Sequence, residues 1–237
     1  MALYTISDTH LSFSVPKPMD IFGSRWSGYT EKLAAAWREQ ISETDTVVIG
    51  GDISWAMSLE EAEADLRFLD ELPGKKIIGR GNHDYWWDTM KKMRSFLSIH
   101  QITTIDFLFN NAFPCGPYTI CGSRGWWNEE KAAPGNADYE KILAREAGRL
   151  RLSLNAARTA GGEPIVFLHF PPVYRGSVCT GITDVLEEYG IRYCYYGHLH
   201  TLYDIPPSLL YNGIRYTLVS ADYLNFRPMP IETESIL

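Results

Sequence analysis

The sequence contains little cysteine: a chain of 237 residues has only Cys115, Cys121, Cys179 and Cys194. These form no CxxC pair, and they are too sparse for the disulfide framework of a small secreted protein. No apolar run approaches the roughly 18 residues that cross a bilayer. The first residues lack a basic segment followed by an apolar one, so we expect no secretory signal. Together these absences predict a reduced, cytoplasmic protein without a membrane partner.

The chain also lacks a surplus of positive charge, because 22 Lys and Arg residues face 29 Asp and Glu residues, a net charge of −7. Proteins dedicated to nucleic acids or anionic membranes neutralise phosphates with surplus lysine and arginine. A nucleic-acid partner is therefore not expected. A small phosphate-bearing substrate stays compatible with this charge, because bound metal ions dominate the field of their own site.

What the sequence does contain is an alternation of short apolar runs and helical patterns. Hydrophobic residues make up 45% of the chain, enough for a large core. Most of the apolar runs are too uniformly apolar for a half-exposed sheet, which is typical of strands buried on both faces. The predicted strands are 3–6, 46–49, 75–78, 118–121, 164–168, 192–196 and 215–219, and the predicted helices are 29–41, 59–72 and 138–157. This alternation predicts a layered α/β sandwich.

One stretch, residues 110–135, is rich in Gly, Pro, Trp and Asn and has no clear periodicity. Because it is embedded between strand signals, we do not interpret it as a linker between domains. The chain also shows no internal repeat and no low-complexity segment. We therefore expect a single domain over residues 1–237.

Short polar motifs stand at the ends of five predicted strands. They are Asp8-Thr9-His10, Gly51-Asp52, Gly81-Asn82-His83-Asp84, His169 and Gly197-His198-Leu199-His200. In open α/β sheets, functional groups gather at the carboxyl ends of the strands, where a rigid scaffold holds the loops. The chain has six histidines, and only His100 lies outside these motifs.

Each motif alone has an ordinary structural explanation, such as a turn for Asp52 or a satisfied core position for His169. The ordered set at five strand ends is not explained in that way. Its side chains offer oxygen and nitrogen ligands of the kind that metal ions bind. The set therefore predicts a metal site formed by Asp8, His10, Asp52, Asn82, His169, His198 and His200.

In this order, the motifs Asp-x-His, Gly-Asp, Gly-Asn-His-Asp, His and Gly-His-x-His resemble those of the calcineurin-like metallophosphoesterases. They extend from Asp8 to His200, and no metal-binding position of the family pattern is missing. Residues 51–56 and 79–87 also resemble a bacterial subgroup of predicted phosphohydrolases. The resemblance implies the calcineurin-like fold, in which helices flank two central mixed β-sheets.

The resemblance further implies a dinuclear metal centre. One metal ion would be held by Asp8, His10, Asp52 and His200, and the other by Asp52, Asn82, His169 and His198. Asp52 would bridge both ions, because a carboxylate offers two acceptor oxygens. Mixed imidazole and oxygen ligands suit Mn, Fe, Zn or Co better than Ca. Two divalent transition-metal ions are therefore the expected cofactors.

The activity implied by the resemblance is hydrolysis of a phosphomonoester or phosphodiester. A hydroxide that bridges the two metal ions would attack phosphorus in line with the leaving oxygen. In the family, the position of His83 protonates the leaving group or stabilises the transition state, and we expect Asp84 to orient the imidazole of His83. The alternative for His83 is a purely supporting hydrogen bond.

Substrate contacts are less well defined by the sequence. Arg124 follows a predicted strand, and its guanidinium suits a phosphate group as a bidentate donor, although a surface arginine beside core tryptophans explains it equally well. The leading hypothesis is a hydrolase of a small phosphoester, with nucleotide-like substrates among the candidates. The alternatives are a nuclease, a phosphate-sensing module that binds metal without turnover, and a catalytic subunit whose partner contacts the stretch 110–135.

Overall fold

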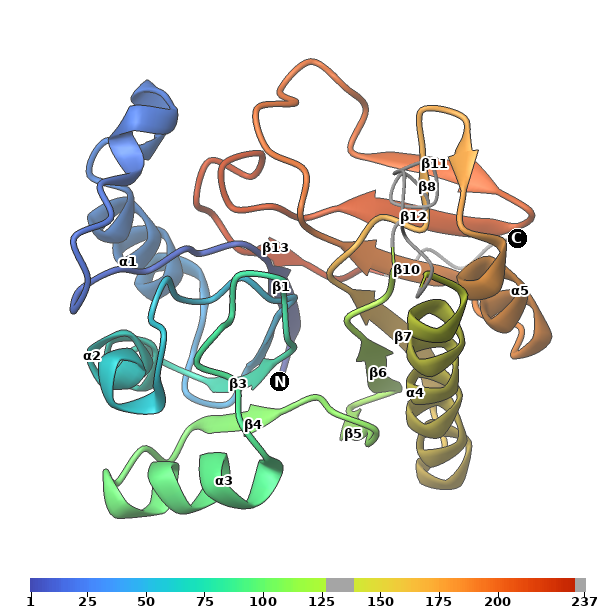
Figure 1. Cartoon of the computed structure of the whole chain (residues 1–237), viewed down its shortest axis with the longest axis horizontal. Helices are drawn as coiled ribbons and strands as arrows, with labels where there is room; N and C mark the ends of the chain where they lie inside the picture. The colour runs from blue at the N-terminus through green and yellow to red at the C-terminus, as the bar shows by residue number, and fades with distance from the viewer. Residues whose placement is uncertain (127–138, 233–237) are drawn as a thin grey trace.

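Two mixed β-sheets form the centre of the molecule, and helices cover their outer faces (Figure 1). The computed structural model describes residues 1–126 and 139–232. The first sheet has five strands in the order β13 (Met229–Pro230), β1 (Leu3–Ile6), β2 (Thr46–Ile49), β3 (Lys75–Ile78) and β4 (Ile105–Phe107). The second has six strands in the order β11 (Ser208–Tyr211), β12 (Ile214–Leu218), β10 (Tyr193–Tyr196), β7 (Glu163–Leu168), β6 (Tyr118–Ser123) and β5 (Phe113–Cys115). The expected layered α/β fold with two central sheets is confirmed.

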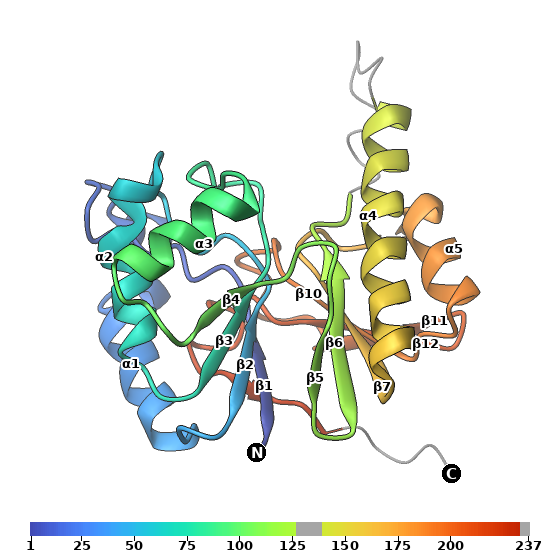
Figure 2. The ribbon, with the colours of Figure 1, turned by 90° about the horizontal axis from the view of Figure 1, so that it is seen from below.

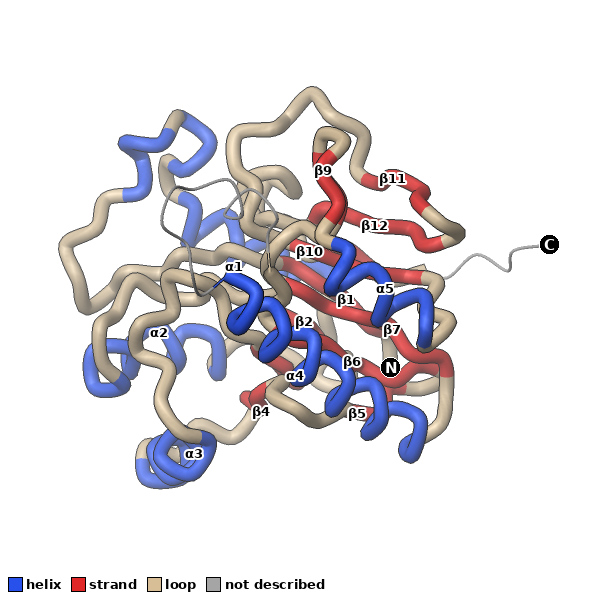
Figure 3. Tube along the Cα trace, turned by 45° about the vertical axis from the view of Figure 1, so that its right-hand side comes forward, coloured by secondary structure: helices blue, strands red, loops and turns tan. Residues whose placement is uncertain are grey.

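Parallel pairing dominates both sheets. Strands β1 to β4 run parallel, and β13 pairs antiparallel at the edge. In the second sheet β12, β10, β7 and β6 run parallel, between the antiparallel edge strands β11 and β5. The carboxyl ends of the central strands therefore meet at one end of each sheet, where Figure 3 shows that loops gather. A short separate pair, β8 (Val173–Tyr174) and β9 (Ser177–Val178), lies among these loops.

The helices form two outer layers. Figure 2 shows α1 (Tyr29–Gln40), α2 (Leu59–Asp70) and α3 (Met90–Ile99) on one side, and α4 (Tyr139–Ala160) and α5 (Thr180–Glu188) on the other. Two 3₁₀ helices, η1 (Met19–Phe22) and η2 (Ser24–Trp26), precede α1. None of the helices in the described ranges is long and apolar enough to cross a bilayer.

A shared apolar core joins the two sheets. Val48 and Ile77 of the first sheet belong to the same buried cluster as Ile165, Phe167 and Tyr195 of the second. An isolated parallel bridge between Ser7 and Ser220 adds a backbone link between the segments that follow β1 and β12. On this shared core we propose that the chain folds as one domain.

The predicted elements are all present, with ends shifted by at most three residues; the largest shift is at the end of α4, which continues to Ala160. Helices α3 and α5 were missed, as were the strands β4, β5, β8, β9, β11 and β13. The first part of the stretch 110–135 contains the unpredicted strand β5 as well as β6, which was predicted. Residues 127–135 of that stretch lie outside the described residues.

Candidate metal centre

The predicted ligands meet where the carboxyl ends of five strands converge. Asp8 and His10 follow β1, Asp52 follows β2, Asn82 follows β3, His169 follows β7, and His198 and His200 follow β10. The backbone at four of these residues is left-handed, with positive φ at Asp8 (60°), His10 (43°), Asp52 (50°) and His198 (69°). Such conformations cost roughly 1 kcal/mol or more each in non-glycine residues and cluster at functional sites.

Backbone hydrogen bonds between the loops hold this strained geometry. The amide of Asp8 donates to the carbonyl of Gly51 at 2.9 Å, and that of His10 donates to the carbonyl of Asp52 at 3.0 Å. The amide of His198 donates to both carboxylate oxygens of Asp8, at 3.0 and 2.9 Å. A side chain at Gly197 would collide with the Asp8 carboxylate, which explains why glycine stands there.

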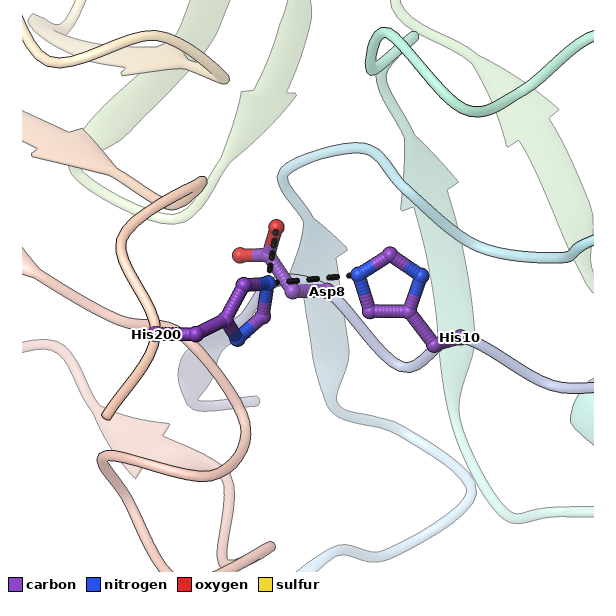
Figure 4. A group of neighbouring side chains, drawn as sticks. All are labelled: Asp8, His10 and His200. Atoms are coloured by element: carbon purple, nitrogen blue, oxygen red, sulfur yellow. Dashed lines mark hydrogen bonds and ion pairs between the residues drawn. The ribbon is translucent and has the colours of Figure 1, made fainter. Parts of the chain in front are cut away.

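The first ligand group consists of Asp8, His10 and His200 (Figure 4). One ligand atom from each lies within 4.8 Å of the others. The Nε2 atoms of His10 and His200 are 3.2 Å apart, and Nε2 of His200 is 3.7 Å from Oδ1 of Asp8. Two imidazole nitrogens and a carboxylate oxygen thus point toward a common centre.

The second group consists of Asp52, His169 and His198, again within 4.8 Å of one another. The Oδ1 atom of Asn82 lies 2.7 Å from Nε2 of His169 and so adds a neutral oxygen to this group. A single atom, Oδ2 of Asp52, lies 3.5 Å from Nε2 of His169 and 3.7 Å from Nε2 of His10. Asp52 therefore stands between the two groups, as a bridging ligand would.

Burial drives these side chains toward their neutral forms. Desolvation raises the pKa of Asp8 to about 6 and raises that of Asp52 well above its usual range. It also lowers the pKa of His198 to about 4 and lowers those of His10 and His169 well below the ordinary value. Imidazoles that stay unprotonated at neutral pH are in the state that metal ions bind.

The chemistry of the buried donor atoms is further evidence for metal ions. Nε2 of His10 and Nε2 of His169 both face Oδ2 of Asp52, at 3.7 and 3.5 Å. Carboxylates buried without a cation carry a large desolvation penalty, which bound cations offset. A donor set of imidazole nitrogens and carboxylate and amide oxygens fits Mn, Fe, Zn or Co. The residues present therefore fit two divalent transition-metal ions.

His83 lies beside the first ligand group. Its ring centroid is 5.8 Å from that of His10 and 4.5 Å from that of Trp55. Its backbone amide donates to Oδ1 of Asp52 at 2.7 Å. Burial lowers the pKa of His83, and the charges of His200 and Lys17 lower it further.

Asp84 does not orient the imidazole of His83, which corrects our expectation for this contact. Its buried carboxylate instead accepts from the backbone amides of Asp52 (2.8 Å), Ile53 (2.8 Å) and Gly81 (2.7 Å) and from Nε1 of Trp86 (3.0 Å). Nδ1 of His83 has no hydrogen-bond partner among the described residues. Asp84 therefore ties the loop after β3 to the loop after β2, so that it positions Asp52 rather than His83.

Arg124 is not part of either ligand group. Its backbone carbonyl accepts from the amides of His169 and Phe170, both at 3.0 Å, and so supports the loop that carries His169. Its guanidinium faces the buried Glu146, with Nη2 at 3.5 Å from Oε1.

Asp222 is a site residue that the sequence analysis missed. Its Oδ1 lies 2.9 Å from Nδ1 of His200, and its Oδ2 accepts from the amide of Thr201 at 3.0 Å. Burial opposes protonation of His200, but the hydrogen bond to Asp222 and the charges of Asp8 and Asp222 raise the pKa of His200 above its ordinary value. The sequence offered one indication of this role, which is the position of Asp222 after the strand β12. That strand lies next to β10, which precedes His200.

A pocket of about 200 Å³ opens onto the ligand groups. Its polar wall contains Asp52 and four of the motif histidines, and its apolar wall is formed by Met19, Phe22, Trp26 and Trp55. The Trp55 ring stacks on His10, with centroids 4.8 Å apart. The apolar wall comes mainly from η1 and η2, for which the sequence analysis predicted no role.

The sequence matches the family model described as calcineurin-like phosphoesterase over residues 1–202. No curated protein matches the sequence. Among solved structures, phosphopantetheinyl hydrolase from Mycobacterium tuberculosis is similar, with a TM-score of 0.54 and 16% identity over 100% of this chain and 97% of that one. The TT1561 protein of Thermus thermophilus is also similar, with a TM-score of 0.57 and 13% identity over 93% of this chain and 89% of that one. At these identities the likeness is one of fold.

Proposed function

Because the chain belongs to the calcineurin-like phosphoesterase family, we propose that it hydrolyses phosphomonoester or phosphodiester bonds in a small substrate. The family and the two candidate ligand groups make it a metal-dependent phosphoesterase.

The two metal ions are assigned to the two ligand groups. Asp8, His10 and His200 would hold one ion, and His169, His198 and Asn82 would hold the other. Asp52 is assigned to both, because its Oδ2 lies between His10 and His169. When bound, two such ions supply positive charge for the phosphoryl oxygens and activate water for attack.

His83 is assigned to the leaving group. Its imidazole lines the pocket beside His10 and Asp52. Nδ1 is buried, so Nε2 is the nitrogen left to meet the substrate. A hydrogen bond or proton from Nε2 to the departing oxygen would lower the barrier for a poor leaving group. The backbone amide of His83 also holds Oδ1 of Asp52 in place.

The pocket supports a substrate with a flat or apolar leaving group. Trp55 and Trp26 give it an aromatic wall next to His10 and His83. Aromatic rings stack on planar groups, which favours a substrate whose leaving group is a base, an aryl group or a similar planar group. The volume of about 200 Å³ suits one small group rather than a nucleic-acid strand. A nucleotide-like substrate fits these walls.

The observation that carries the proposal is the position of Asp52 between two converging ligand groups. We would strip the protein of metal, add Mn²⁺ and measure hydrolysis of p-nitrophenyl phosphate and bis(p-nitrophenyl) phosphate. Metal-dependent turnover is expected, and Asp52→Asn should reduce it to the background rate. His100→Asn is the matched control, because His100 pairs with Glu63 at 2.8 Å outside the centre.

Two results would contradict the proposal. Turnover that needs no metal and survives in Asp52→Asn would exclude a dinuclear centre at this site. Two tightly bound ions without hydrolysis of any phosphoester would favour a phosphate-sensing module.

A further inference from the structure

A second recess lies next to the metal centre, and arginines line it. We call it the arginine recess; its lining includes Arg80, Arg124, Arg149, Glu146, Phe109 and Asn110. Arg80 follows β3 and Arg124 follows β6, whereas Glu146 and Arg149 belong to α4. The recess therefore draws its charged groups from both sheets and from the helix that covers the second sheet.

Among the described residues that line the recess, positive charge exceeds negative charge, because three arginines accompany one acidic residue, Glu146. Glu146 is 1% exposed, and its Oε1 lies 2.5 Å from Nη1 of Arg149 and 3.5 Å from Nη2 of Arg124. Arg80 makes no ion pair with a described residue, and its Nε is buried without a hydrogen-bond acceptor among them. Arg80 is half-buried, and an anion bound to its guanidinium would also supply the acceptor that the buried Nε lacks among the described residues.

Two connections place the recess beside the metal ligands. Arg80 is two residues from Asn82 in the loop after β3. The carbonyl of Arg124 accepts from the amide of His169 at 3.0 Å. Both Asn82 and His169 belong to the second ligand group. The recess shares no described lining residue with the aromatic pocket, so the two are separate cavities.

We propose that the arginine recess binds a second phosphoryl group of the substrate, carried next to the phosphorus that is attacked. Guanidinium groups bind phosphate oxygens in a bidentate manner, and Arg80 makes no ion pair with a residue that the structure describes. The recess is small, at about 20 Å³, so it excludes a sugar or a base. The inference rests on the proposed function and narrows it to phosphoesters that carry two phosphoryl groups.

The test compares two non-hydrolysable probes that differ by one such group, methylphosphonate and methylenediphosphonate. Their dissociation constants are measured by calorimetry on the metal-loaded protein. The wild-type chain is expected to bind methylenediphosphonate at least about tenfold more tightly than methylphosphonate. In Arg80→Gln and in Arg149→Gln this preference should fall to about threefold or less.

Arg158→Gln is the matched control, because Arg158 also lies on α4 but stacks on Tyr189 at 4.2 Å outside the recess. Because Arg158→Gln leaves the recess intact, any metal that methylenediphosphonate removes by chelation would be lost from this variant as well. Glu146→Gln supplies a test in the opposite direction: it removes the competing carboxylate, and binding of methylenediphosphonate should tighten several-fold. A purely structural ion cluster would not produce that gain.

An undiminished preference in folded Arg80→Gln and Arg149→Gln would overturn the inference, as would weaker binding in Glu146→Gln. The binding assay needs no turnover. A chain that prefers the diphosphonate through Arg80 but hydrolyses no ester would therefore contradict the proposed function and leave the recess assignment standing.

Discussion

Oδ1 of Asp222 lies 2.9 Å from Nδ1 of His200, on the side of the imidazole opposite to the one that faces Asp8 and His10. Asp222 is itself held, because the amide of Thr201 and the hydroxyl of Tyr203 donate to its Oδ2. The carboxylate therefore fixes the orientation of the ring and keeps the proton on Nδ1. Carboxylates in this position raise the affinity of histidines for metal.

We expect Asp222→Asn to weaken binding of one metal ion about 10–100-fold, as for other supporting carboxylates of ligating histidines. An amide cannot supply the negative charge that favours the correct tautomer of His200. The measurement is calorimetric titration of metal into the stripped protein. Asp204→Asn is the control, because Asp204 is exposed. Equal metal affinity in both variants would mean that Asp222 serves the fold alone.

We expect His83→Gln to lower kcat while the metal content stays at two ions per chain. The loss should be about 100-fold or more for a methyl or propyl ester, in the range typical of general acid catalysis. It should be much smaller for p-nitrophenyl phosphate, whose leaving group needs little protonation. Rates with both kinds of ester, together with metal analysis, check this. An equal loss for both leaving groups would assign His83 a positioning role instead.

We expect Trp55→Leu to reduce the preference for aryl over alkyl phosphoesters. Aromatic stacking contributes roughly 0.5–1.5 kcal/mol, which corresponds to about a two- to tenfold change in the ratio of kcat/KM values. The comparison is phenyl phosphate against propyl phosphate. Tyr85→Leu should leave the ratio unchanged, because Tyr85 is 52% exposed and does not line the pocket. A ratio that is insensitive to Trp55 would show that the leaving group lies elsewhere.

Two adjacent lysines of β3 should differ sharply in their effect on stability. Lys76 is fully buried, and its Nζ donates to the carbonyls of Leu72 and Gly74 and to Oγ1 of Thr104. Lys76→Met leaves these acceptors unsatisfied and should lower the free energy of unfolding by about 2–4 kcal/mol. Lys75→Met removes a half-exposed ion pair with Asp106 and should cost less than about 1 kcal/mol. Urea denaturation of both variants measures the difference, and similar midpoints would contradict it.

Sequence reasoning located the strands of the site because buried parallel strands leave short, uniformly apolar runs that end in polar motifs. It identified the side chains that converge in the structure because five of the six histidines stand in those motifs. It missed short edge strands such as β13, whose two residues carry no periodic signal. The helix α3 was missed although Met93, Phe96 and Leu97 mark its buried face. No strong signal for the end of a helix separates this segment from the motif that contains His83.

The supporting contacts were harder to infer because they join residues far apart in the chain. Asp84 is adjacent to His83 in sequence, yet its carboxylate points to the amides of Asp52 and Ile53, which only the tertiary fold brings near. Asp222 is 22 residues from His200 and belongs to no motif. Arg80 is next to a recognised motif, but only the tertiary fold shows that its Nε is buried without a hydrogen-bond acceptor among the described residues.

The division of ligands between the two sheets sets an order of events during synthesis. Asp8, His10, Asp52 and Asn82 follow strands of the first sheet, whereas His169, His198 and His200 follow strands of the second. A nascent chain that has completed only the first sheet lacks part of each ligand group, so it cannot hold either ion with the affinity of the finished centre. If these residues hold the ions, we expect metal to be bound only after about residue 200 has left the ribosome and β10 has joined its sheet.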